Sequence, residues 1–287
     1  MFPSAFDYVV ATSVEEAIAA KAEGGDETRF LAGGQSLLPM MKIRLADPAK
    51  LVDINRIPGL DQFERANGHL RVGALVRHAT VAGSDLPEGA VAAAAPWVAD
   101  PLIRNAGTLC GSVAHCDPEG DWNSVLLATG ADVIAQGPTG SRTIPIESFH
   151  QGMFTNALED DEMVTEVRIR VPDGSWGGSY LKLERKVGDY ATVAAATHLE
   201  LAGDGTISRA GVGLTSVYSH NLKVTDAEAV LVGNQPSEEL FTEAAHIAGQ
   251  ACDPHSDVRG SAEWKRQVVR TYVRRGLTAA ASQANGE

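Results

Sequence analysis

Two glycine-containing segments, about 75 residues apart, constrain the fold of this 287-residue chain more than any other feature. The first, FLAGGQSLLPMMKIRL at residues 30–45, places Gly33 and Gly34 between an apolar run and a helix-like run. Glycine tolerates positive φ and allows another group to approach the main chain closely. A strand that feeds a glycine turn at a helix N-terminus leaves N–H groups unpaired, and these can bind an anion. The segment therefore predicts either a tight strand-to-helix turn or an anion-binding loop.

The residues after the two glycines favour a helix. Ser36 is positioned to cap it, and Pro39 falls in its first turn, where a missing N–H costs little. We expect this helix to end before Asp47-Pro48, because the residue before a proline disfavours helical geometry.

The second segment, IRNAGTLCGSVAHCDPEGDW at residues 103–122, repeats the small, polar character of the first. Two such loops, each with main-chain N–H groups and a hydroxyl, can hold a diphosphate from both sides without a cationic side chain. Three carboxylates follow, at Asp117, Glu119 and Asp121, and one of them can accept hydrogen bonds from sugar-like hydroxyls. A solvated acidic loop is the alternative interpretation.

The composition limits the class of protein. The chain length predicts two domains, and 44% hydrophobic with 21% charged residues is ordinary for a globular protein. A formal net charge of −13 argues against a nucleic-acid partner held by phosphate neutralisation. We expect no signal peptide and no membrane span, since no apolar run approaches the roughly 20 residues required. Three cysteines form no disulfide framework, which favours a reducing cytoplasm.

The first half of the chain mixes short strands and helices. SVEEAIAAKAEG at 13–24 is a predicted helix with a Ser-x-x-Glu capping box and a terminal glycine. Short strands are expected at 28–32, 51–55 and 69–76, followed by a helical tract that runs through 91–97. Residues 131–146 predict a hairpin with its turn at 137–140.

In the second half of the chain, apolar and polar residues alternate more strongly. Strands are predicted at 162–172, 180–186, 191–201 and 207–217, with Gly203-Asp204-Gly205 as a hairpin turn, and two helices are predicted at 237–252 and 262–284. Residues 171–179, VPDGSWGGS, are interpreted as a Pro/Gly/Ser linker between two domains.

Other chemical motifs are weak. Cys110, His115 and Cys116 resemble metal ligands, but no fourth ligand lies at a zinc-like spacing. The chain contains no phosphate-loop lysine motif, no G-x-G-x-x-G and no G-x-S-x-G elbow, and the G-x-G at 211–213 falls inside a predicted strand. We therefore expect neither a metal site nor an acid–base or nucleophilic catalytic group in this chain.

Taken together, AGGQSLLPMMKIRLADPAKLVDINRI and IRNAGTLCGSVAHCDPEGD resemble the flavoprotein subunit of molybdenum hydroxylases, the xanthine dehydrogenase family. Within that family the chain most resembles the medium subunit of aerobic carbon monoxide dehydrogenases. The resemblance covers almost the whole chain, including ALEDDEMVTEVRIRVP at 157–172 and KLERKVGDYATVAAA at 182–196.

The resemblance implies an α+β fold with noncovalently bound FAD. Residues 1–175 would form a two-lobed FAD-binding domain of the PCMH or vanillyl-alcohol-oxidase type, with lobes at about 1–55 and 56–175. Residues 176–287 would form a smaller α/β domain of the CO dehydrogenase flavoprotein C-terminal type. The implied partners are a small subunit with two [2Fe-2S] clusters and a large subunit with the molybdenum cofactor, assembled as a dimer of heterotrimers. Three scattered cysteines cannot hold a four-thiolate cluster in this chain itself.

The family's cofactor positions map onto this sequence by resemblance. The first diphosphate loop corresponds to Ala32, Gly33, Gly34, Gln35 and Ser36, and the second to Thr108, Leu109, Cys110, Gly111 and Ser112. The remaining positions are Asp121 near the ribityl chain, Leu158 near the dinucleotide, Lys186 close to a flavin contact, and Tyr190 beside the isoalloxazine.

Three of these positions depart from the family pattern. Gln35 replaces a histidine in the first loop, and Cys110 and Ser112 replace glycine and asparagine in the second. A cysteine fits a position that presents its main-chain N–H only if φ there is negative. His115 and Cys116 also depart from the usual small or amide residues.

The implied function is electron transfer. FAD would accept electrons from the iron–sulfur clusters and pass them to an external acceptor such as a quinone, while carbon monoxide is oxidised with water to CO2 at the molybdenum of another subunit. The same role in a purine, aldehyde or nicotinate hydroxylase is one alternative, and a flavin-free docking scaffold is another. We expect the protein in the cytoplasm, or at the inner face of the membrane through its partners.

Overall fold

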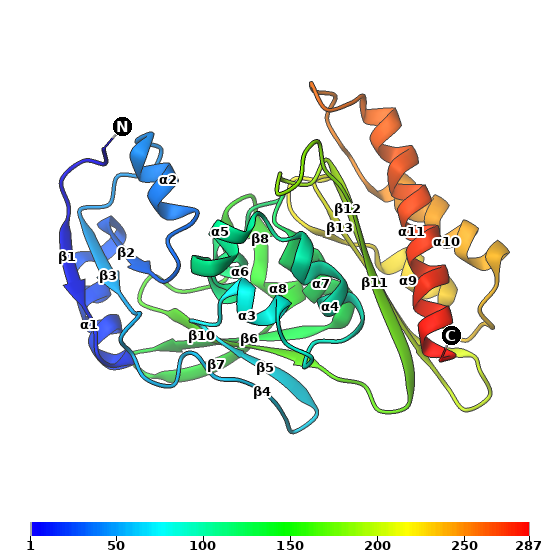
Figure 1. The fold of residues 1–287 in the computed structure, drawn as a ribbon, viewed down its shortest axis with the longest axis horizontal. Coiled ribbons are helices and arrows are strands. Elements are labelled where there is room, and N and C mark those ends of the chain that lie inside the picture. The colour runs from blue at the N-terminus through cyan, green and yellow to red at the C-terminus, as the bar shows by residue number, and fades with distance from the viewer. Residues whose placement is uncertain (1, 287) are drawn as a thin grey trace.

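The computed structural model describes residues 2–286 as three main β-sheets in a row, with helices between and around them (Figure 1). The strands are β1 Asp7–Val10, β2 Thr28–Leu31, β3 Lys50–Asp53, β4 Phe63–Ala66, β5 His69–Gly73, β6 Ala131–Gly137, β7 Gly140–Pro145, β8 His150–Gly152, β9 Thr155–Asn156, β10 Met163–Arg170, β11 Ser175–Leu183, β12 Val193–Leu201, β13 Ile207–Thr215 and β14 Leu222–Lys223. The helices are α1 Val14–Gly24, η1 Gly25–Glu27, α2 Leu37–Lys42, α3 His78–Ala82, α4 Gly89–Ala94, η2 Ala95–Trp97, α5 Pro101–Ala106, α6 Leu109–His115, α7 Asp121–Thr129, α8 Ile146–Phe149, α9 Thr225–Leu231, α10 Glu238–Ala251 and α11 Ala262–Ala284.

The first sheet is parallel, with strand order β1-β3-β2, and helix α1 packs against β2 and β3. The predicted helix at 13–24 is confirmed, because Ser13 accepts a hydrogen bond from the N–H of Glu16 at its start. Strand β2 ends at Leu31, directly before the first glycine segment. The parallel sheet therefore delivers that segment at the carboxyl end of a strand.

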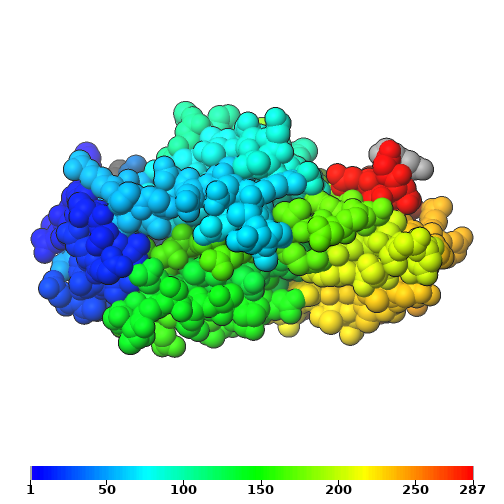
Figure 2. All heavy atoms as spheres, turned by 90° about the horizontal axis from the view of Figure 1, so that it is seen from below, coloured from blue at the N-terminus to red at the C-terminus, as the bar shows by residue number. Residues whose placement is uncertain are grey.

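The second sheet is antiparallel, with order β4-β5-β10-β6-β7, and contains the predicted hairpin of β6 and β7. Helix α6, whose residues 109–115 belong to the second glycine segment, packs against β5 and β10. Figure 2 shows the chain ends at opposite sides of the molecule, with this sheet's residues between them.

The third sheet is antiparallel, with order β11-β12-β13-β14. Strand β12 is buried on both faces: Ala194 and Ala196 belong to the core shared with the first two sheets, whereas Val193 and Ala195 belong to a second core under α10 and α11. Small alternating side chains allow helices to pack on both faces of this strand. The third sheet is thereby fixed to the rest of the molecule.

The G-x-G motif inside β13 serves this packing. A Cβ built at Gly211 would lie 1.8 Å from the carbonyl oxygen of Ala128, and one at Gly213 would lie 2.0 Å from that of Ser124. Both carbonyls belong to α7, so the two glycines let this helix contact the sheet through its main chain. Helix α7 begins at Asp121, and its position against β13 sets where that carboxylate lies.

Three sequence-based predictions need correction. Residues 175–179 are not linker but the start of β11, because Gly177 and Gly178 allow α11 and α4 to contact that strand closely. Ser36 precedes α2, but its hydroxyl makes no capping hydrogen bond. Helix α9, which has no side-chain cap, was missing from the predicted elements. Over residues 2–286, no helix combines the length and apolar character that crossing a membrane requires.

Candidate functional site

A cavity of about 990 Å³ runs between the first two sheets and reaches the loop between β11 and β12. Its volume is at the upper end of the range of roughly 300–1,000 Å³ that is typical of small-molecule sites. Both glycine segments line it, together with the β8–β9 turn and residues 188–190. The cavity thus joins parts of the chain that are far apart in sequence.

In the first glycine segment, residues 32–36, the main-chain donors are free. Over the described part of the chain, the N–H groups of Gly33, Gly34, Gln35 and Ser36 make no hydrogen bond to protein. Gly34 has φ +69°, a conformation that side chains rarely adopt. Consecutive unpaired N–H groups beside a cavity form a site suited to an anion.

The second glycine segment, residues 107–112, has most of its main-chain N–H groups paired with protein acceptors. Thr108 caps α6 by accepting a hydrogen bond from the N–H of Gly111 at 3.1 Å, and the N–H of Leu109 donates to Val76. Among the described residues no acceptor pairs with the N–H of Cys110, which sits in the first turn of α6. The second segment therefore offers fewer N–H donors than the first, plus the hydroxyl of Ser112.

The two glycine segments touch each other. A Cβ built at Gly33 would lie 2.3 Å from the carbonyl oxygen of Ala106 and 2.6 Å from the Cα of Gly107. No side chain other than hydrogen fits between these main-chain atoms. Gly33 thus serves the contact between the segments in addition to lining the cavity.

A hydrogen-bonded pair of side chains braces this contact. The amide of Asn55 donates to the carbonyl oxygen of Ala32 at 2.9 Å, and its oxygen accepts from Arg77 at 2.6 Å. Arg77 also donates to the carbonyl oxygen of Ala106 at 2.8 Å. One continuous chain of hydrogen bonds therefore connects the first segment to the second, which fixes their separation.

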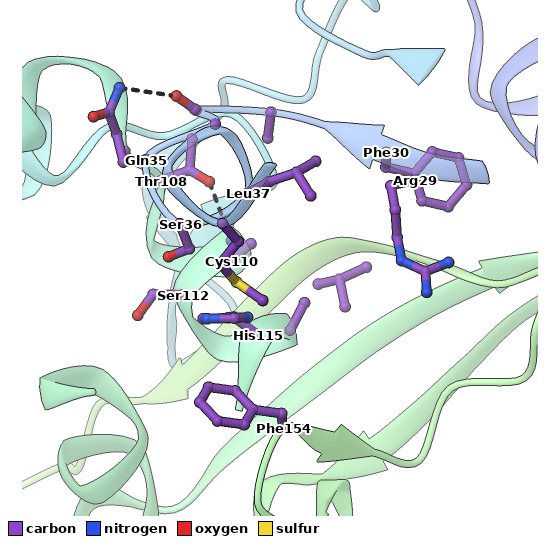
Figure 3. A pocket seen from close by; sticks show the side chains of 18 of the residues that line it. Arg29, Phe30, Gln35, Ser36, Leu37, Thr108, Cys110, Ser112, His115 and Phe154 are labelled. Carbon is purple, nitrogen blue, oxygen red and sulfur yellow. Dashed lines mark hydrogen bonds between the residues drawn. The ribbon is translucent and has the colours of Figure 1, made fainter. Parts of the chain in front are cut away.

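Figure 3 shows the side chains where the two segments meet the cavity. The hydroxyls of Ser36 and Ser112 point toward the same side in this view, and both residues line the cavity. Gln35 points away from them and donates to the carbonyl oxygen of Gly33 at 3.2 Å. His115 and Phe154 lie further along, with ring centroids 5.0 Å apart.

Asp121 lines the cavity but is already engaged by two residues of β11. Its carboxylate accepts hydrogen bonds from the Tyr180 hydroxyl and from the Lys182 ammonium, the latter at 3.0 Å. Lys182 also donates to the carbonyl oxygen of Trp97 at 2.9 Å and lies 3.6 Å from Glu184. Burial raises the pKa of the Asp121 carboxyl, and the donors Lys182 and Tyr180 oppose that rise. This buried cluster links the third sheet to the cavity wall.

Tyr190 lines the cavity from the loop between β11 and β12. Its side chain is 48% exposed, and Gly188, with φ +81°, precedes it. Partial burial and the nearby carboxylate of Asp117 raise the pKa of Tyr190 to about 12, so the phenol is neutral at physiological pH. Its half-exposed ring is accessible from the cavity.

Leu158 lines the cavity next to the β8–β9 hairpin. Its N–H donates to the side chain of Asn156, whose amide donates to Ala114 at 2.8 Å, next to the second segment. Arg29 and Phe30 from β2 also line the cavity. One guanidinium nitrogen of Arg29, Nη1, donates to the carbonyl oxygens of Asp26 and Thr28.

The structure brings most of the predicted site residues to one cavity. Those that line it are Ala32, Gly33, Gly34, Gln35, Ser36, Thr108, Cys110, Gly111, Ser112, Asp121, Leu158 and Tyr190. Leu109 is instead fully buried in the hydrophobic core, and Lys186 is exposed and lies off the cavity.

Residues that shape the site were missed by the sequence reasoning: Asn55, Arg77, His78 and Lys182. For Lys182 a signal existed, because Tyr180, Lys182 and Glu184 alternate along one face of a predicted strand. The other three act through tertiary contacts that no local pattern displays.

The cysteines do not form a metal site. Over residues 2–286 no group of three or more histidine, cysteine or acidic side chains is arranged to hold an ion. The thiols of Cys110 and Cys116 donate to the carbonyl oxygens of Val72 and Val113, and burial raises both their pKa values. Cys110 does not have positive φ, so a cysteine is tolerated in the second segment.

Comparisons with known proteins agree with this geometry. The profile described as FAD binding domain in molybdopterin dehydrogenase matches residues 4–174, and the profile described as CO dehydrogenase flavoprotein C-terminal domain matches residues 178–280. The fold and cavity thus define a flavoprotein of the FAD-binding class.

Similar proteins cover the whole chain. The 6-hydroxypseudooxynicotine dehydrogenase complex subunit alpha of Paenarthrobacter nicotinovorans is 40% identical over 99% of this chain and 97% of its own length. The carbon monoxide dehydrogenase medium chain of Hydrogenophaga pseudoflava is 36% identical over 98% of both chains. A solved structure of the carbon monoxide dehydrogenase from Hydrogenophaga pseudoflava matches with a TM-score of 0.94 and 38% identity, covering 99% of each chain.

The chain therefore belongs to the medium, FAD-binding subunits of the molybdenum hydroxylase family. It is an oxidoreductase flavoprotein subunit of the CO dehydrogenase type, which confirms the family and fold class that the two glycine segments indicated.

Proposed function

We propose that this chain carries noncovalent FAD and transfers electrons from the [2Fe-2S] clusters of a small partner subunit to an external acceptor such as a quinone. The oxidation itself takes place on a large partner subunit that holds the molybdenum cofactor. Bound FAD supplies the redox chemistry, while this chain supplies binding, orientation and electrostatics. We further propose that the partners assemble as a dimer of heterotrimers.

The free main-chain donors at the cavity support this proposal most directly. Gly33, Gly34, Gln35 and Ser36 line the cavity and have unpaired N–H groups, and the Cys110 N–H with the Ser112 hydroxyl adds donors from the second segment. This donor set fits a diphosphate, which requires several hydrogen bonds and little positive charge from side chains. The cavity volume of about 990 Å³ fits a ligand as large as a dinucleotide.

We propose that two other predicted positions contact the same ligand. The half-exposed ring of Tyr190 contacts the isoalloxazine, and Leu158 contacts the dinucleotide, since both residues line the cavity. Asp121 has both carboxylate oxygens engaged by Tyr180 and Lys182, so its role toward the ribityl chain depends on the remaining lone pairs.

Two classes of substrate are candidates for the large partner subunit. Carbon monoxide, oxidised with water to CO2, two protons and two electrons, is favoured by the matching carbon monoxide dehydrogenase chains. A nitrogen heteroaromatic or related amine is favoured by the relatives named for 6-hydroxypseudooxynicotine, at 40% identity, and nicotine, at 36%.

Two measurements test the proposal. The purified full chain should have a flavin absorption spectrum and about one FAD per chain; a colourless protein that binds no added FAD would support the docking-scaffold alternative. The complex captured with this chain from its host should contain molybdenum and iron. Reduction of its flavin by carbon monoxide or by nicotine-type compounds then distinguishes the two substrate classes.

Replacement of Tyr190 by alanine should keep most of the FAD but change the flavin spectrum and the rate of reoxidation by the acceptor. Ring-on-ring packing contributes only roughly 0.5–1.5 kcal/mol beyond buried area, so we expect FAD affinity to fall about 2- to 13-fold. Tyr190→Phe keeps the ring and serves as the control. Unchanged spectrum and reoxidation kinetics in Tyr190→Ala would show that this ring does not contact the flavin.

A further inference from the structure

His78 lines the cavity although no cofactor position of the sequence analysis includes it. It is the first residue of α3 and is 5% exposed. Its N–H donates to the carbonyl oxygen of Gly107 at 3.0 Å, and a Cβ built at Gly107 would lie only 3.0 Å from His78 Nε2. The imidazole therefore packs directly against the second glycine segment.

Trp122 determines which imidazole nitrogen of His78 carries a proton. The indole Nε1–H donates to His78 Nδ1 at 3.0 Å, and both side chains are buried. An indole nitrogen can only donate, so Nδ1 must hold a lone pair. An imidazolium would instead set two N–H groups against each other.

The surroundings also keep the ring neutral. Burial lowers the pKa of His78 to about 4, and the positive charges of Arg104 and Arg77 act in the same direction. With Nδ1 unprotonated and the ring neutral, the single proton resides on Nε2. His78 is thus a neutral side chain that can donate a hydrogen bond through Nε2–H.

Within residues 2–286 the Nε2–H of His78 has no hydrogen-bond partner, yet the atom is not sealed off by protein. Helix α3 packs against η2 and α5, which flank Val98 and Ala99 in the cavity wall. Ala99 in turn lies against Gly188, two residues before Tyr190. The free donor therefore lies on the wall that runs from Gly107 of the second glycine segment toward the loop that carries Tyr190.

We propose that His78, held in its Nε2–H form by Trp122, donates a hydrogen bond to the ring–ribityl part of FAD. The acceptor is an oxygen or nitrogen atom of the isoalloxazine or a ribityl hydroxyl. Trp122 is then a positioning residue, since it acts only through His78. This inference rests on the proposed FAD function.

Nitrogen NMR of the full chain, labelled with 15N-histidine, tests the tautomer and the contact together. At pH 7 the His78 signals, assigned by their loss in His78→Gln, should show a protonated Nε2 and an unprotonated Nδ1. Addition of FAD to the chain from which flavin has been removed should shift the Nε2 signal. An Nδ1–H tautomer, an imidazolium, or an Nε2 signal that FAD leaves unchanged would each overturn the proposal.

Two substitutions give an independent test by FAD titration. His78→Phe keeps a ring but removes the donor, and loss of one neutral hydrogen bond should weaken FAD binding about 3- to 10-fold. His78→Gln keeps an N–H near the Nε2 position and should restore affinity to within about 2-fold. Equal affinities of His78→Phe and the natural protein would contradict the contact while leaving FAD binding intact. Absence of FAD binding in the natural protein would instead refute the proposed function.

Discussion

Replacement of Gly33 by alanine is expected to weaken FAD binding by about 5- to 150-fold. The new methyl carbon would lie 2.3 Å from the carbonyl oxygen of Ala106 and 2.6 Å from the Cα of Gly107. Main-chain atoms cannot rotate away, so the two glycine segments must separate. Forced overpacking of this kind costs about 1–3 kcal/mol, which corresponds to roughly 5- to 150-fold in affinity if cofactor binding must restore the contact.

The matched control is Gly203→Ala in the turn between β12 and β13. No atom lies within 4 Å of a Cβ at that position, and its φ is not positive, so we expect unchanged FAD affinity. Both variants are compared by FAD titration, with circular dichroism to confirm folding. A Gly33→Ala protein that folds and binds FAD as tightly as Gly203→Ala would show that the contact between the segments does not control the site.

The local chemistry of both glycine segments was predictable from sequence, because it depends on residues close together in the chain. Gly34 adopts positive φ, and Thr108 caps a helix that begins one residue later, as a threonine before a helical run often does. The role of Gly33 was not predictable in the same way. A glycine with ordinary φ gives no local signal, and its partner Ala106 lies 73 residues away in a different part of the fold.

The difference between local signals and tertiary contacts also explains why residues 171–179 were wrongly predicted to be a linker. A stretch with three glycines, a proline and two serines has the composition of a loop, yet its second half is strand. Gly177 is needed because a Cβ there would lie 2.1 Å from the carbonyl oxygen of Ala280 in α11. Composition alone cannot distinguish a flexible glycine from one that permits close packing.

The hydrogen bonds of Asn55 and Arg77, and the His78–Trp122 pair, could not be predicted from the sequence because they are tertiary contacts. In the sequence, Asn55 and Arg77 look like ordinary polar residues beside strands. Their function depends on hydrogen bonds to each other and to the carbonyl oxygens of Ala32 and Ala106. The resemblance to a family supplies the positions that contact the cofactor. It does not supply the side chains that hold those positions in place.

Replacement of Lys182 by methionine is expected to lower the free energy of unfolding of the flavin-free chain by about 3–5 kcal/mol, the usual cost of removing one partner from a buried ion pair. The Lys182 ammonium is almost fully buried and lies 3.0 Å from Asp121 and 3.6 Å from Glu184. Without it, the buried Asp121 carboxylate and the carbonyl oxygen of Trp97 lose a hydrogen-bond donor, and the Glu184 carboxylate loses its ion-pair partner. Lys42→Met, at an exposed position on α2, is the control and should change stability by less than about 0.5 kcal/mol.

The pH dependence of this deficit identifies its cause. Without the opposing charge of Lys182, burial holds the pKa of the Asp121 carboxyl above its value in the unfolded chain. A carboxyl whose pKa is raised in the folded state makes the protein less stable as pH rises through that pKa. The loss of unfolding free energy in Lys182→Met should therefore be larger at pH 8 than at pH 5. Urea unfolding of Lys182→Met and of the control Lys42→Met at the two pH values measures this difference in unfolding free energy.

In Asp121→Asn combined with Lys182→Met, the loss of unfolding free energy should be smaller than the sum of the losses in the two single variants, because the uncompensated charge is gone. A deficit that is independent of pH, together with additive single losses, would indicate that Lys182 contributes through packing of its methylene groups rather than through its charge.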